Sequence, residues 1–132
     1  MGKQKIVAKQ HPEDIVQQQV VAYLTAVARP LKIAFHSVPN EAAMKGRDGK
    51  AKYALILWLK KMGLIKGAAD LVIYYDHGHA AVLECKSPTG RQSESQIDFE
   101  TWIRRPGVEV PYYLIRSIKE LETVLRLLGI TK

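Results

Sequence analysis

The sequence has a single cysteine, Cys85, among its 132 residues. One cysteine cannot form a disulfide within the chain, so the sequence does not belong to the class of small, disulfide-stapled secreted domains. The longest uninterrupted apolar run covers only residues 54–59, far below the ~20 residues that span a bilayer. The basic residues near the N-terminus are not followed by the apolar stretch of a secretory signal. We therefore expect a cytoplasmic protein without a membrane span.

Internal repeats, low-complexity tracts and proline-rich linkers are also absent, which predicts one domain over residues 1–132 with a flexible segment at 1–11. The sequence contains no Walker-type phosphate loop, no zinc-ligand cluster and no Ser/His/Asp arrangement. A His-x-His pair, His77 and His79, has no further Cys or His nearby in the sequence, and it is more typical of a hairpin tip than of a transition-metal site.

The chain has fewer acidic than basic residues, with 13 Asp and Glu and 20 Lys and Arg, which give a formal net charge of +7. Such an excess favours a polyanionic partner such as nucleic acid, although solubility alone would also account for it. Residues 45–52 combine basic side chains with two glycines, which predicts a mobile loop that contacts backbone phosphates. The expected DNA contacts are Lys45, Arg47, Lys50, Lys52 and Arg91.

Hydrophobic periodicity predicts a small mixed α/β domain with the element order α, β, α, β, β, α, β, α. The expected helices cover residues 13–28, 51–62, 93–104 and 117–128, and the expected strands cover 32–38, 69–75, 80–86 and 110–115. We expect Pro30 to end the first helix. The last two helices are expected to begin at capping boxes that start at Ser93 and at Ser117.

Three ionisable residues on two consecutive predicted strands carry the strongest chemical signal. Asp70 lies on the first strand, and Glu84 and Lys86 lie on the second. Because strand side chains alternate, Glu84 and Lys86 share a face about 6.6 Å apart, and Cys85 points into the core. Two carboxylates can bind a hard cation such as Mg²⁺, and a lysine can stabilise negative charge on a phosphate. The pattern fits phosphodiester hydrolysis, with a structural salt bridge from Lys86 to Glu84 or Asp70 as the alternative.

Convergence of these side chains requires a hairpin loop with an odd number of residues, or a bulge. A two-residue turn at His77 and Gly78 would place Asp70 opposite Cys85, on the wrong face of the sheet. We therefore predict a three-residue loop at 77–79, or one bulge, with Asp70 opposite Lys86.

Asp70 followed by Glu84-x-Lys86 resembles the PD-(D/E)xK nuclease pattern, with Ala69 where a proline often stands. Further stretches, in the same order, are similar to those of the VRR-NUC domain, the virus-type replication–repair nuclease module. These stretches are Glu13 with Gln17, residues 38–41 (VPNE), residues 63–70 (GLIKGAAD) and residues 90–96 (GRQSESQ). The resemblance covers about residues 13–116 and is to the short stand-alone form that phages and bacteria encode.

This resemblance implies a restriction-endonuclease-like core, a mixed four-stranded sheet flanked by helices. It implies a Mg²⁺ cofactor, with Mn²⁺ able to substitute, held by Asp70, Glu84, the Cys85 main-chain carbonyl and Glu13. The catalytic residues that it implies are Lys86, Glu84, Asp70, Gln96 and Gln17. It further implies a structure-selective endonuclease that acts as a homodimer on branched DNA such as Holliday junctions.

For two of these residues, Gln96 and Glu13, a purely structural role is an alternative. Gln96 is the fourth residue of the capping box at Ser93 and could serve only its helix. Glu13 could be an acid in the first helical turn, where the helix dipole favours it. For the whole protein, the alternatives are a catalytically inactive nucleic-acid-binding module with the same fold and a small basic interaction protein.

Overall fold

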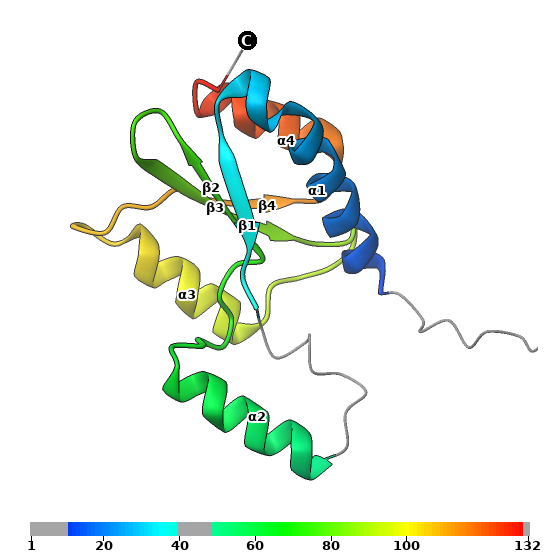
Figure 1. Ribbon diagram of the computed structural model, residues 1–132, viewed down its shortest axis with the longest axis vertical. Coiled ribbons are helices and arrows are strands. Elements are labelled where there is room, and N and C mark those ends of the chain that lie inside the picture. The colour runs from blue at the N-terminus through cyan, green and yellow to red at the C-terminus, as the bar shows by residue number, and fades with distance from the viewer. Residues whose placement is uncertain (1–10, 40–48, 131–132) are drawn as a thin grey trace, which may run out of the picture.

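A computed structural model describes residues 11–39 and 49–130 of the chain. Within these ranges the elements follow the predicted order (Figure 1). The helices are α1 (Pro12–Leu31), α2 (Gly49–Lys61), α3 (Glu94–Arg104) and α4 (Ile118–Leu127). The strands are β1 (Ala34–Ser37), β2 (Leu71–Tyr75), β3 (His79–Cys85) and β4 (Tyr112–Ile115). None of the helices in the described ranges is both long enough and apolar enough to cross a membrane.

The four strands form one mixed sheet in the order β1-β2-β3-β4. β1 pairs with β2, and β2 with β3, in antiparallel fashion. β3 and β4 are parallel, and α3 makes the crossover connection between them. The prediction of a mixed four-stranded sheet flanked by helices is therefore confirmed.

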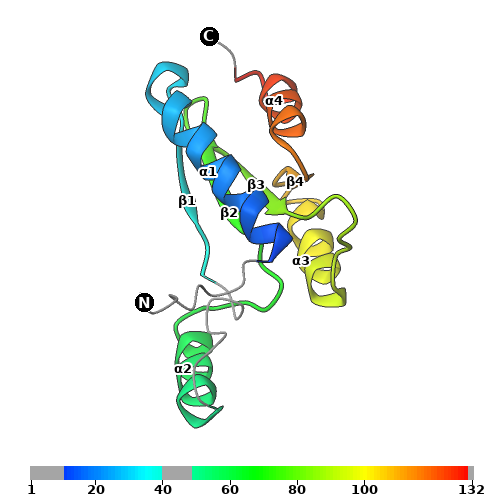
Figure 2. The same ribbon diagram turned by 90° about the vertical axis from the view of Figure 1, so that its right-hand side faces the viewer.

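The main core lies between one face of the sheet and the helices α1 and α4, which lie near one another in both views (Figures 1 and 2). α1 contributes Val16, Val20 and Leu24, whose spacing places them on one face of the helix. Alternate residues of β2 and β3 meet them from the sheet, and Cys85 is among these buried side chains. The predicted inward direction of Cys85 is therefore confirmed.

The opposite face of the sheet is covered by α3. Phe99 and Ile103 of this helix pack against Val82 and Tyr112, over the β3–β4 half of the sheet. On the β1–β2 half of the same face, Tyr74 is exposed. α2 lies outside the layers of the sheet and the other helices in both views (Figures 1 and 2), but its Leu59 lines an apolar pocket together with Val72 and Phe99.

One helix end and one capping box differ from the prediction. α1 does not end before Pro30 but continues to Leu31, because a proline in the last turn has a helical φ and costs only one backbone hydrogen bond. Lys32 then closes the helix in the left-handed conformation. The capping box at Ser93 is confirmed. At α4, Ser117 caps the helix, but the Glu120 carboxylate accepts from the Arg116 N–H instead of returning to Ser117.

The β2–β3 hairpin has the predicted three-residue loop, shifted by one position. Tyr75 pairs with His79, so the loop consists of Asp76, His77 and Gly78. All three loop residues have positive φ angles, which an aspartate tolerates better than most side chains. Extension of this register places Asp70 opposite Glu84. The shared face is confirmed, whereas the predicted pairing of Asp70 with Lys86 was wrong.

Candidate active site

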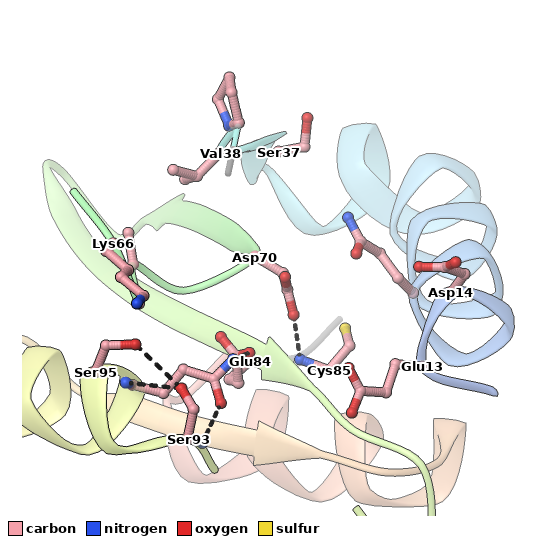
Figure 3. Close-up of a pocket in the computed structure, with 15 residues that line it drawn as sticks. Glu13, Asp14, Ser37, Val38, Lys66, Asp70, Glu84, Cys85, Ser93 and Ser95 are labelled. Carbon is pink, nitrogen blue, oxygen red and sulfur yellow. Dashed lines mark hydrogen bonds between the residues drawn. The ribbon is translucent and has the colours of Figure 1, made fainter. Parts of the chain in front are cut away.

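A pocket of about 510 Å³ opens where strand ends meet the first turns of two helices. It lies beyond the end of β1, the start of β2 and the end of β3, and α1 and α3 each begin at its wall (Figure 3). Its charged lining residues are Glu13, Asp14, Lys66, Asp70 and Glu84. The pocket thus brings together carboxylates from two strands and one helix within a chain that is basic overall.

Asp70 and Glu84 are held in place by separate hydrogen bonds. The Cys85 N–H donates to Asp70 Oδ2 at 2.7 Å, and the Val38 N–H donates to the Asp70 main-chain oxygen at 2.8 Å. Gln96 Nε2 donates to Glu84 Oε1 at 2.7 Å. Each carboxylate is therefore fixed by a contact from a neighbouring element.

The other oxygen of Glu84 is the most unusual atom of the pocket. Glu84 is only 2% exposed, and its Oε2 is buried without a hydrogen-bond partner among the described residues. An unsatisfied buried carboxylate oxygen is costly, and such groups usually coordinate a cation or are protonated. Glu84 Oε2 is thus an atom that could take either a cation or a proton.

Burial raises the pKa of Glu84 to about 8, and the negative charge of Asp70 adds to the shift. Burial also raises the pKa of Asp70, against the opposing effects of the Cys85 N–H and the Lys86 charge. Two carboxylates this close compete for ionisation unless a cation lies between them. The metal-free pocket therefore favours a proton on Glu84 at neutral pH.

Lys86 is 4% exposed and pairs with a residue of α1. Its Nζ lies 3.6 Å from Glu13 Oε1. This ion pair differs from the one that the structural alternative required, in which Lys86 pairs with Glu84 or Asp70. Lys86 is not among the residues that line the pocket, although its partner Glu13 is.

Arg116 fixes the segment that follows Lys86. Its Nη1 donates to the main-chain oxygens of Ser87 and Gly90, at 2.7 Å each. Gly90 of this turn lies close to Glu13, since a Cβ at Gly90 would lie 3.2 Å from Glu13 Oε1. The sequence carries no signal for this role, because Arg116 lies 26 to 29 residues away from its partners.

Gln96 has both of the roles that the sequence left open. Its Oε1 accepts from the Ser93 N–H at 2.8 Å, which completes the capping box, and its Nε2 contacts Glu84. The amide can do both because it has a donor and an acceptor. Gln17 also lines the pocket. Cys85 lines the pocket as well, and its main-chain N–H contacts Asp70. Burial raises the pKa of the Cys85 thiol to about 12, so the thiol stays neutral.

The predicted DNA contacts lie elsewhere. Lys50 and Lys52 belong to the first turn of α2 and not to a loop, since residues 50–52 are good helix formers. Arg91 is exposed after β3. None of these three residues lines the pocket. Lys45 and Arg47 lie outside the described residues.

Sequence reasoning assigned no role to Lys66, Asp14 or Ser95, which also line the pocket (Figure 3). Lys66 is an exposed cation at its rim. Lys66 precedes Gly67 in residues 63–70, which resemble the nuclease domain. This position was the only feature of the sequence that could have predicted a role for Lys66.

Gly67 allows the start of β2 to touch the start of α3. Its φ is +87°, and a Cβ at this position would lie 2.3 Å from the Ser95 main-chain oxygen and 2.8 Å from the Gln96 nitrogen. The absence of a side chain at Gly67 therefore lets Gln96 reach Glu84.

Substitution of Gly67 by alanine is expected to destabilise the protein by about 3 kcal/mol or more, because backbone strain and a main-chain clash add together. Gly78→Ala is the matched control, since Gly78 has a φ of +101° but no atom within 4 Å of the added Cβ. The control is expected to cost about 1 kcal/mol. Urea unfolding of both variants measures the difference, and equal costs would contradict the close contact.

The chain was compared with protein families, curated proteins and solved structures. No match was found in any of the three comparisons. In the part of the chain that the structure describes, no group of three or more His, Cys, Asp or Glu residues is placed to hold a metal ion. The resemblance to VRR-NUC nucleases and the metal site therefore stay predictions, and the function is argued from the geometry of the pocket.

Proposed function

We propose that this protein is an endodeoxyribonuclease that hydrolyses phosphodiester bonds with Mg²⁺ or Mn²⁺ as its cofactor. The observation that carries the proposal is the buried, unpartnered oxygen of Glu84 beside Asp70, with a buried lysine two residues further on. Buried charges are costly in a fold that needs them only for stability. A cation-binding site that acts on a phosphate would account for all three residues.

The donor set suits a hard divalent cation. Mg²⁺ prefers oxygen ligands, keeps several waters and is often bound through only one or two carboxylates, so a group of three protein ligands is not needed. Asp70 and Glu84 would hold the ion, with the Cys85 carbonyl as a further ligand. Glu13, which pairs with Lys86 in this structure, would have to move to join them. The free Glu84 oxygen and the carboxylates around it fit this role.

A divalent cation supplies polarisation of a phosphoryl oxygen and a lower pKa for an attacking water. The residues of the chain do the rest. Gln96 and the Cys85 N–H hold the two strand carboxylates in fixed positions, which avoids reorganisation during the reaction. Lys86 would have to exchange its partner Glu13 for the phosphate in order to stabilise the negative charge that builds there. Lys66 at the rim would attract the neighbouring phosphates of the DNA backbone.

Two finer parts of the proposal rest on the resemblance. They are the preference for branched DNA, such as a Holliday junction, and action as a homodimer. A catalytically inactive DNA-binding module is less well supported, because it would have no use for the unpartnered carboxylate oxygen beside a buried lysine.

The test is cleavage of labelled duplex, flap, single-stranded and four-way-junction DNA with Mg²⁺, Mn²⁺ or a chelator. Lys86→Ala is expected to lose activity, and Lys119→Ala, an exposed lysine of α4, serves as the matched control. Cleavage that survives chelation, or equal activity in Lys86→Ala, would contradict the mechanism. Binding of DNA without cleavage of any substrate would favour the inactive module.

The metal-free protein is expected to lose stability as the pH rises from about 4.5 to about 8. The reason is that the pKa of Glu84 rises from its ordinary value of 4.5 to about 8 on folding, so the folded state binds an extra proton across this window. Metal binding requires the ionised carboxylate, so Mn²⁺ should raise the melting temperature more at pH 8 than at pH 6. Thermal melts of the wild type and of Glu84→Gln measure both effects. An equal response in the variant would exclude Glu84 as a ligand.

A further inference from the structure

A second pocket, of about 400 Å³, lies on the face of the sheet that α3 covers in part. We call it the apolar pocket, because all of the described side chains in its lining are apolar. Val72 and Val82 line it from the sheet, Phe99 from α3 and Leu59 from α2. Its lining differs sharply from that of the candidate active site, which we call the carboxylate pocket.

The two pockets occupy consecutive positions on one face of the sheet. Val72 pairs with Val82, and extension of the same register places Asp70 opposite Glu84. Side chains two residues apart on a strand point to the same face and lie about 7 Å apart. The valine pair therefore follows the carboxylate pair directly along β2 and β3.

The two pockets also adjoin each other, because Val38, Pro39 and Ala68 line both of them. Ile65 lines the apolar pocket, and the next residue, Lys66, is exposed and lines the carboxylate pocket (Figure 3). One short segment thus offers an apolar side chain to one pocket and a cation to the other. A ligand that lies across the boundary would have an apolar group at one end and an anionic group at the other.

A nucleotide with an unpaired base has these two ends, since its phosphate and its base lie on opposite sides of the sugar. With the phosphate at the carboxylate pair, the base would lie over the valine pair, next to the ring of Phe99. Aromatic side chains stack bases without regard to sequence. A paired base would first have to leave its stack, which costs free energy, whereas the cost is least for a base that is already unpaired.

We propose that the apolar pocket receives an unpaired base of the DNA, from the nucleotide next to the phosphate that is cleaved. The inference rests on the proposed nuclease function, and it adds a site that selects the substrate. Among the described residues, no polar side chain lines this pocket, so the hydrogen-bonding edge of the base is not read. The pocket therefore selects DNA by the absence of pairing at the cleavage position and not by its sequence.

The first test measures DNA binding by fluorescence anisotropy, with Ca²⁺ in place of Mg²⁺. One labelled duplex carries a single unpaired thymine, and a second carries an abasic site in place of that thymine. The wild type is expected to bind the first duplex about tenfold more tightly, because only this duplex offers a base to stack. Exchange of the thymine for another base should change the affinity by less than about threefold, since the edge is not read. Equal affinity for the thymine and the abasic site would overturn the proposal.

The second test fills the apolar pocket. Val72→Phe adds bulk to the pocket with a residue that strands favour, and it is expected to remove the preference for the thymine over the abasic site. Val108→Phe is the matched control, because it makes the same exchange at a position that is 45% exposed and lines neither pocket. A Val72→Phe protein that melts like the control and keeps the full preference would contradict the assignment. The comparison of the two duplexes in the wild type does not depend on the folding of any variant.

The binding measurement and the cleavage measurement can fail separately. A wild type that cleaves DNA but binds the thymine and the abasic duplex equally would overturn the base pocket and leave the nuclease proposal. A wild type that prefers the thymine but cleaves no DNA with Mg²⁺ or Mn²⁺ would support the base pocket and overturn the nuclease proposal. A wild type that binds neither duplex would overturn the base pocket whatever the cleavage assay shows.

Discussion

Glu84→Gln is expected to reduce DNA cleavage about a thousandfold or more, since it removes a carboxylate that binds the cation. The substitution keeps the size of the side chain and the acceptor for Gln96 Nε2. The pKa of Glu84 is about 8 in the metal-free protein, so a neutral group already occupies this position at neutral pH. The variant should therefore fold, with a melting temperature without metal that is no lower than that of the wild type at pH 8.

Single-turnover cleavage of the preferred DNA substrate measures the loss, and a melt in the absence of metal measures the fold. Glu122→Gln, at an exposed position on α4, controls for the loss of one negative charge. A variant that folds and still cleaves DNA at the wild-type rate would rule out Glu84 as a ligand.

Lys86→Met is expected to reduce cleavage by a factor of about 10²–10⁴, which is the usual contribution of a residue that assists proton transfer or charge stabilisation. Methionine fills the space of the buried lysine stem but has no ammonium group. The loss of the ion pair should cost little stability, because the side chain of its partner Glu13 is 44% exposed and can be solvated.

The structural explanation of Lys86 makes the opposite prediction. If the ion pair serves only the fold, Lys86→Met should lower the melting temperature and leave the cleavage rate of the folded fraction unchanged. DNA binding measured by fluorescence anisotropy adds a second criterion. A pure loss of affinity, with an unchanged rate at saturating DNA, would make Lys86 a binding residue instead of a catalytic one.

Local rules decided most of the secondary structure. Periodicity located every helix and strand of the described ranges. Most of these elements have an apolar face that packs into the core, and α2, which has no buried residue, is an exception. The hairpin loop was predicted one position too late, which shifts the partner of Asp70 by two residues, because Asp76 adopts a left-handed conformation and joins the loop. The left-handed conformation of a single residue changes the free energy by about 1 kcal/mol, and residue patterns cannot predict so small a difference.

The sequence by itself determined that Asp70, Glu84 and Lys86 lie at neighbouring strand positions, because alternation and an odd hairpin loop are properties of the local chain. Only the tertiary structure decided their partners. The pairing of Glu13 with Lys86, and the reach of Gln96 to Glu84, depend on where α1 and α3 pack against the sheet. Those positions result from contacts across the whole core, since side chains far apart in sequence must fill one interior together.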